Sequence, residues 1–90
     1  MKQAYGYIVK NGCKAEDFSM RCHFIIFADR AVDADKYIQT EYIEKEIERE
    51  KFKDDDGNIV NHWWKFYSVE KVPVSKFDND SANIVWLEGE

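Results

Sequence analysis

The sequence predicts a two-layer α+β domain, with one helix on one face of an antiparallel four-stranded sheet and the element order ββαββ. Two observations support this prediction. Four segments are rich in β-branched and aromatic residues and are bounded by turn residues. One longer segment between them repeats apolar residues at helical spacing. Ninety residues with 16% aromatics are expected to form a single domain, residues 1–90, with an adequate small core.

Two strands are expected before the helix. Residues 4–9 alternate loosely and contain Tyr, Ile and Val, and the following Asn11-Gly12 pair is a strong turn signal. A longer strand is expected over residues 18–27, where apolar side chains dominate one face and Arg21 and His23 lie on the other. These two strands are predicted to form a hairpin.

The helix is expected to follow the second strand directly. Asp29 is a plausible N-cap, with Asp33 as the competing cap, because a carboxylate there can accept hydrogen bonds from the free amides of the first turn. The helix is expected to end near residue 52, because the sequence DDDGN at residues 54–58 is typical of a turn.

The apolar residues of this helix do not form one regular stripe. At about 100° per residue, Ile43 and Ile47 lie on the side opposite Ile38. Three explanations stay open: a bend or π-type bulge near residues 40–42, an early helix end, or a second contact surface made by Ile43 and Ile47. The first stripe consists of Ala31, Ala34, Ile38 and Tyr42.

A third strand is expected over residues 59–69 and a fourth over residues 83–87, with Pro73 and a turn at residues 78–81 between them. The third strand contains the sequence HWWKFYS, which puts large rings on both of its faces. One face is expected to carry Val60, Trp64 and Phe66, and the other Ile59, Trp63, Tyr67 and Val69.

One helix covers only one face of such a sheet, so the second aromatic face needs another cover. Exposed apolar patches of several hundred Å² usually mark interfaces, and Trp and Tyr are common in the energetically dominant part of an interface. We therefore expect an interface there. The alternative is a core closed by loops, including the segment of residues 73–81.

The net charge of −5 is concentrated on the predicted helix and the turn after it. Residues 33–56 contain ten acidic and five basic residues, whereas the rest of the chain contains eight of each. Binding to DNA or RNA depends on clustered cations, and the sequence contains no such cluster. Direct nucleic-acid binding is therefore not expected.

No motif in the sequence predicts an enzyme, a cofactor or a metal site. The possible zinc ligands, Cys13, Cys22, His23 and His62, lack the close pairing of a zinc site, and DDDGN does not fit an EF-hand loop. There is no glycine-rich phosphate loop and no G-x-S-x-G nucleophile motif. We expect a protein that is not an enzyme.

The start of the chain, MKQAYGYIVK, has no apolar run of the signal-peptide type, and no segment approaches the length of a membrane span. Two cysteines are too few for a disulfide framework. These features predict a cytoplasmic protein with reduced thiols and no membrane contact.

The stretch FIIFADRAVDADKYI resembles the strand-into-helix junction of small phage-encoded inhibitors of bacterial defence, such as the anti-CRISPR proteins. Many of these are acidic single-domain chains of this length, with a short sheet and one helix. The resemblance implies an inhibitor that acts in the host cytoplasm by binding a macromolecule. It assigns no role to any individual residue.

The leading hypothesis is a small acidic protein, itself a homo-oligomer, that occludes or inhibits a protein partner. The expected partner-binding residues are Glu41, Glu44, Glu48, Trp63 and Tyr67. The expected oligomer contacts are Ile43, Ile47 and Trp63. Two alternatives stay open: a protein that sequesters a nucleotide or other small molecule by stacking on its sheet aromatics, and a structural or regulatory subunit.

Overall fold

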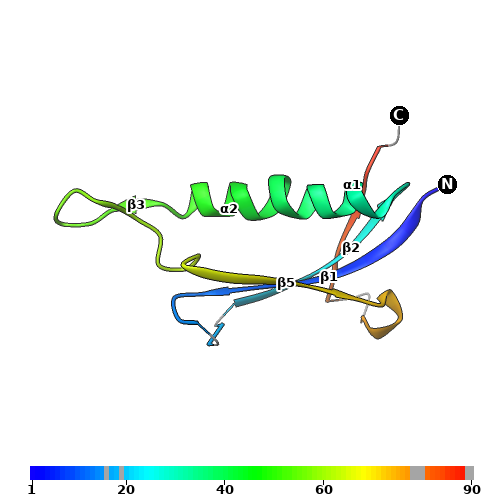
Figure 1. The fold of residues 1–90 in the computed structure, drawn as a ribbon, viewed down its shortest axis with the longest axis horizontal. Coiled ribbons are helices and arrows are strands. Elements are labelled where there is room, and N and C mark those ends of the chain that lie inside the picture. The colour runs from blue at the N-terminus through cyan, green and yellow to red at the C-terminus, as the bar shows by residue number, and fades with distance from the viewer. Residues whose placement is uncertain (16, 19, 78–80, 89–90) are drawn as a thin grey trace.

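A computed structural model describes residues 1–15, 17–18, 20–77 and 81–88. It shows an α+β fold in which one helix lies along one face of a four-stranded sheet (Figure 1). A second, two-stranded sheet projects beyond the end of the helix. The main sheet has the strand order β5-β1-β2-β6, formed by β1 (Gln3–Gly12), β2 (Met20–Ala28), β5 (Phe66–Val72) and β6 (Asn83–Trp86).

The predicted hairpin of the first two strands is present, but it reverses later than expected. β1 continues through Asn11 and Gly12, and Asn11 pairs with Met20 of β2. The prediction of a turn at Asn11-Gly12 is therefore wrong. The Asn11 side chain is buried and donates a hydrogen bond to another segment, so this asparagine serves packing instead of a turn.

The sheet is mixed, so the prediction of a fully antiparallel sheet is wrong in one strand. β5 and β2 are each antiparallel to β1, whereas β6 is parallel to β2. The register explains this, because the end of β5 and the start of β6 lie at the same level of the sheet. Val72, Gly6, Ile25 and Ile84 form one row across the four strands. Three strand spacings of about 4.8 Å separate its ends, and β5 and β6 run in the same direction.

Residues 73–77, which follow β5, lie over the sheet face opposite the helix. The 3₁₀ turn η2 (Val74–Lys76) leads to Phe77, whose ring stacks on His23 at 5.4 Å. A Cβ on Gly6 would lie 2.7 Å from the Phe77 ring and 2.4 Å from the Val72 carbonyl oxygen, so only glycine fits there. Residues 78–80 of the predicted turn lie outside the described residues.

The helix begins and ends differently from the prediction. Its three segments are α1 (Ala31–Lys36), a π-helical segment η1 (Tyr37–Ile43) and α2 (Glu44–Arg49). Arg30, not Asp29 or Asp33, occupies the N-cap position, and no side chain caps the helix there. The Asp29 carboxylate instead lies 3.9 Å from the Lys2 ammonium. Glu50, not residue 52, follows the last helical residue, because Phe52 pairs into β3 (Phe52–Lys53).

The π-helical segment resolves the irregular stripe. Hydrogen bonds from residue i to i+5 accommodate one more residue than an α-helical turn. Ile38 and Ile43 are five residues apart, and both are buried against the sheet, Ile43 completely (0% exposed). Ile47 follows on the same side and packs partly against the core. Of the three explanations, the π-type bulge is the one that the structure shows.

Ile43 therefore cannot serve as an oligomer contact, and that prediction is wrong. It belongs to the core between the helix and β1–β2, together with Ile38, Tyr7, Phe24 and Ile26. The partly buried Ile47 faces the same core, so a second apolar helix surface is not needed. The helix has one apolar side, and it is directed at the sheet.

The predicted third strand, residues 59–69, is divided into three parts. Its beginning is β4 (Ile59–Val60), which pairs with β3 and forms the projecting hairpin that we call the arm (residues 52–60). Residues 61–65 form a turn, and only then does β5 begin. The radius of gyration, 14.8 Å, exceeds the roughly 12 Å expected of a compact 90-residue domain, in line with the projecting arm.

A polar contact ties the start of the helix to two strands. The Tyr7 hydroxyl donates to Asp35 Oδ1 at 2.6 Å, and the Lys71 ammonium donates to Asp35 Oδ2 at 2.9 Å. Burial, and then the adjacent carboxylate, raises the pKa of the Tyr7 hydroxyl. Partial burial alone would raise the pKa of Asp35, but Tyr7 and Lys71 favour its ionised form and hold that pKa below its ordinary value.

Deleting Gln39, an exposed residue of the π-helical segment, should leave the fold intact. The deletion places Ile38 and Ile43 four residues apart, so a regular α-helix keeps both on the sheet. Inserting one alanine after Gln39 should instead turn Ile43 away from the core and cost about 2–5 kcal/mol. Denaturant unfolding followed by circular dichroism measures both. If the deletion and the insertion lower the free energy of unfolding equally, the π-helical segment does not set the position of Ile43.

Replacing Asp35 with asparagine should reduce the loss of folding stability that occurs as the pH falls from 7 to 3. Because the folded-state pKa of Asp35 is depressed, its stabilising contribution is present above the ordinary carboxyl pKa of about 3.9 and is lost as pH falls below it. At pH 7 we expect Asp35→Asn to cost about 1 kcal/mol, a modest value because this side chain is 40% exposed. Unfolding curves at pH 7 and pH 3 test this, with Asp55→Asn on the arm as the control. If the free energy of unfolding of Asp35→Asn falls between pH 7 and pH 3 as much as that of the parent, Asp35 does not contribute to the acid dependence.

Candidate functional site

The turn at residues 61–65 separates two adjacent tryptophans. The Asn61 amide donates to the Ile47 carbonyl at 2.7 Å, and the Asn61 Oδ1 atom accepts from the Trp64 backbone amide at 3.1 Å. One asparagine thus joins the last turns of the helix to the aromatic segment. The last carbonyl groups of a helix lack intrahelical donors, and Asn61 supplies one to Ile47. The same bond fixes the turn against the helix.

A second asparagine holds the same turn from the sheet. Asn11 Nδ2 donates to the Trp63 carbonyl at 2.9 Å. With its backbone held at both sides, Trp64 points into the core, is 8% exposed, and lies 6.0 Å from the Tyr42 ring. Trp63 points outward and is 48% exposed. Trp63 is therefore the aromatic side chain of this turn that is available to a partner.

The arm carries further apolar side chains in solvent. Phe52 and Ile59 are both exposed, and the Phe52 ring lies 5.3 Å from His62. The tip of the arm is the predicted turn at residues 54–58: Asp54 Oδ1 accepts from the amides of Asp56 and Asn58, and Gly57 has a φ of +83°. These bonds keep the Asp54 carboxylate oxygen within the turn. The turn prediction from composition is confirmed.

The acidic residues predicted to bind a partner are exposed on the outer side of the helix. Glu41 pairs with Lys45 and Glu48 with Lys51, so these two carboxylates are partly neutralised by neighbours in the sequence. The hydrogen bond that Lys45 donates to the Glu41 carboxylate raises the pKa of Lys45. No cation among the described residues pairs with Glu44, which lies between them along the chain.

Tyr67 is exposed, but it does not share a surface strand with Trp63 as predicted. It is the second residue of β5, on the side of the sheet that faces the helix, and its ring lies 6.2 Å from Trp64. The alternation expected of one continuous strand fails because residues 61–65 form a turn. The structure thus brings Tyr67 to the buried Trp64, and it holds Trp63 on the turn outside the sheet.

The sheet face opposite the helix carries exposed apolar side chains that were not among the predicted binding residues. The rings of Phe27 and Trp86 stack at 3.9 Å with an interplanar angle of 5°, and Trp86 is 63% exposed. Ile84 is exposed on the same side of β6. Alternation along residues 83–86 places Ile84 and Trp86 on one face, and that signal was available in the sequence.

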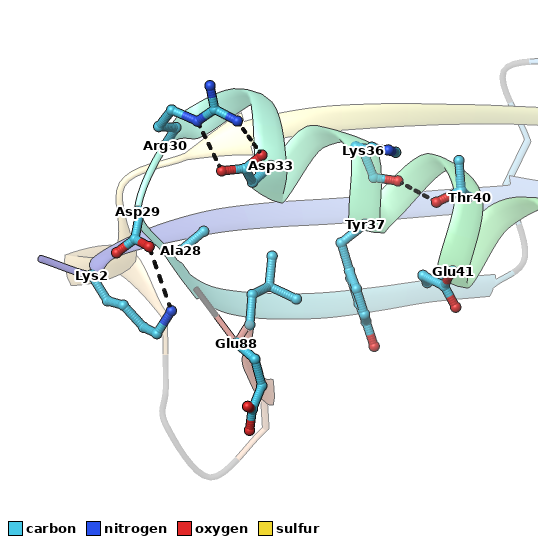
Figure 2. Close-up of a pocket in the computed structure, with 11 residues that line it drawn as sticks. Lys2, Ala28, Asp29, Arg30, Asp33, Lys36, Tyr37, Thr40, Glu41 and Glu88 are labelled. Atoms are coloured by element: carbon cyan, nitrogen blue, oxygen red, sulfur yellow. Dashed lines mark hydrogen bonds and ion pairs between the residues drawn. The ribbon is translucent and has the colours of Figure 1, made fainter. Parts of the chain in front are cut away.

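An open groove of about 680 Å³ lies between the helix and the chain that follows β6 (Figure 2). Four of its charged groups pair with one another: Lys2 with Asp29, and Arg30 with Asp33 at 3.0 Å. The Arg30 hydrogen bond outweighs desolvation and lowers the pKa of Asp33, so this carboxyl is not suited to donate a proton near neutrality. The Thr40 hydroxyl donates to the Lys36 carbonyl at 2.8 Å. These pairings do not prepare a charged or nucleophilic group for a substrate.

Among the described residues, neither a metal site nor a membrane-spanning helix is found. No group of three or more His, Cys, Asp or Glu side chains is arranged to hold a metal ion. No described helix has the length and apolar character needed to cross a membrane.

No protein family, no curated protein and no solved structure matches this chain.

Replacing Asn11 with alanine should destabilise the fold and loosen the aromatic turn. The substitution leaves the Trp63 carbonyl without its buried donor, which costs about 1–3 kcal/mol. We expect weaker near-ultraviolet circular dichroism, because Trp64 and Tyr42 lose their fixed packing. Asn58→Ala, at an exposed position of the arm, is the matched control and should stay within about 0.5 kcal/mol of the parent. Equal effects of the two substitutions would contradict the assigned role of Asn11.

Proposed function

We propose that this chain is a non-enzymatic protein that binds and occludes a protein partner, the mode of action of small phage-encoded anti-defence inhibitors. The observation that carries the proposal is Trp63, a large aromatic side chain that a hydrogen-bonded turn holds out in solvent. Burying such a ring would remove roughly 150–250 Å² from water. Exposed tryptophans of this kind are typical of the energetic centre of an interface.

The position of Trp63 is fixed before any partner binds. Its carbonyl accepts from Asn11, and the next amide donates to Asn61. A side chain whose backbone is already ordered loses less conformational entropy on association than one on a free loop. This preorganisation supports a binding role for the turn.

The charge of the helix favours a partner with a basic surface. Glu44 and Glu48 are exposed on α2, the segment to which Asn61 attaches the aromatic turn. An acidic surface beside an apolar anchor raises association rates and selects against acidic partners. Glu41, one helical turn earlier, extends the same charge.

The chain also exposes more surface than a compact monomer of its mass. The accessible area is 6426 Å², whereas about 5500 Å² is typical of a folded 10.7-kDa chain. The excess is close to the roughly 800 Å² that each partner contributes to an interface of standard size. The projecting arm contributes to this excess, because it adds accessible surface without adding to the core.

Affinity capture with matched tryptophan variants tests the proposal. The immobilised chain and a Trp86→Ala variant should retain the same protein from a bacterial lysate, and Trp63→Ala should lose at least tenfold of that retention, since its truncation removes the anchor. Retention should also fall as ionic strength rises, because exposed charges are screened. If Trp63→Ala captures the same protein as the parent, or if salt has no effect, the proposed surface is wrong.

A further inference from the structure

β5 is a long and open edge of the main sheet. Only β1 pairs with it among the described strands, and six of its seven residues are exposed. Natural edge strands are commonly shortened, interrupted by proline or bulges, or covered, because their unpaired amides and carbonyls bind other strands. β5 carries the charged residues Glu70 and Lys71, but it has no bulge against β1 and no proline within residues 66–72, and Pro73 comes only after its end. The other edge strand, β6, is shorter, with four residues.

The sequence of β5 is complementary to itself in the antiparallel direction. Centred on Val69, the strand FYSVEKV places Ser68 opposite Glu70 and Tyr67 opposite Lys71 of a second copy. Val69 lies opposite itself, and Phe66 lies opposite Val72. The pairs are apolar with apolar, aromatic with the stem of a lysine, and hydroxyl with carboxylate, and no like charges oppose each other. A register centred on Glu70 would instead oppose two carboxylates.

We propose that the occupant of this edge is a second copy of the chain, bound as an antiparallel β5–β5 pair centred on Val69. The two-fold axis is perpendicular to the sheet, so opposing residues share a face and both helices lie on the same side. The result is one continuous eight-stranded sheet with the order β6-β2-β1-β5 followed by its symmetric repeat. This interface lies outside the arm and does not depend on the proposed function.

The acidic helices do not oppose this arrangement. Each helix packs over β1 and β2, as the contacts of Asp35 with Tyr7 and of Tyr42 with Phe24 show. About four strand spacings, roughly 19 Å, therefore separate the two helix axes. This exceeds two Debye lengths at physiological ionic strength, so repulsion between the helices is screened. The Asp35 carboxylate also holds Lys71 on the side of the sheet where the partner's Tyr67 would lie.

Charge substitutions at Val69 give a test that is specific for this register. Val69 is 39% exposed, so a lysine or glutamate can reach solvent without leaving the strand. The parent should sediment with twice the mass of one chain at tens of micromolar. Val69→Lys and Val69→Glu should each sediment as monomers, because like charges oppose at the two-fold axis, and an equimolar mixture should recover the dimer. Ile84→Lys on the other edge should leave the parent dimer unchanged.

Cysteine cross-linking keeps the test decisive if a charged variant unfolds. In a Cys13→Ser background, Val69→Cys should form an intermolecular disulfide under mild oxidation, since directly opposite Cα atoms lie about 4.5–5.5 Å apart. Tyr67→Cys should not, because its two copies would be offset by four residues, roughly 14 Å. A monomeric parent, a dimer indifferent to Val69 charges, equal cross-linking of both variants, or an edge that pairs with a foreign peptide instead would overturn the proposal.

Discussion

The width of a single helix constrains the whole structure. An α-helix with its side chains is about 10 Å across, whereas four strands need nearly twice that width. The helix therefore covers β1 and β2, where Ile38 and Ile43 are buried, and it leaves Tyr67 and Val69 of β5 partly in solvent. The π-helical segment keeps Ile38, Ile43 and the partly buried Ile47 on the side of the helix that faces the sheet. On the opposite face, Phe77 lies against Gly6 and His23 and provides a second, partial cover.

Two asparagines decide which aromatic residues join the core. Asn11 and Asn61 hold the backbone of the turn from the sheet and from the helix, and adjacent tryptophans then point in opposite directions. The same polar bonds that complete the core thereby create a rigid exposed anchor at Trp63. The proposed dimer would carry two such anchors on one rigid sheet, so a partner with two sites would bind with avidity.

The helix, the strands and most of the core follow from sequence patterns, because burial imposes periods that a linear reading detects. Phe24 and Ile26 alternate as a strand requires, and Ala34 and Ile38 keep helical spacing. The parallel placement of β6 depends on a sheet register that no local pattern encodes. The buried role of Asn11 depends on a hydrogen bond across 52 residues, and its local context, Asn-Gly, predicts a turn instead. Long-range hydrogen bonds also determine the site. The sequence predicts an exposed Trp63, but it predicts a strand where Asn11 and Asn61 hold a turn.

Residue-resolved amide hydrogen exchange of β5 tests most directly whether surface left uncovered by the helix is covered by assembly. In a lone edge strand, alternate amides bond to β1 and the others face solvent, so exchange rates alternate along the strand. The account predicts that the fast amides of residues 67–71 become slow as protein concentration rises, while those of the arm stay fast. An alternating pattern that persists at every concentration would contradict it.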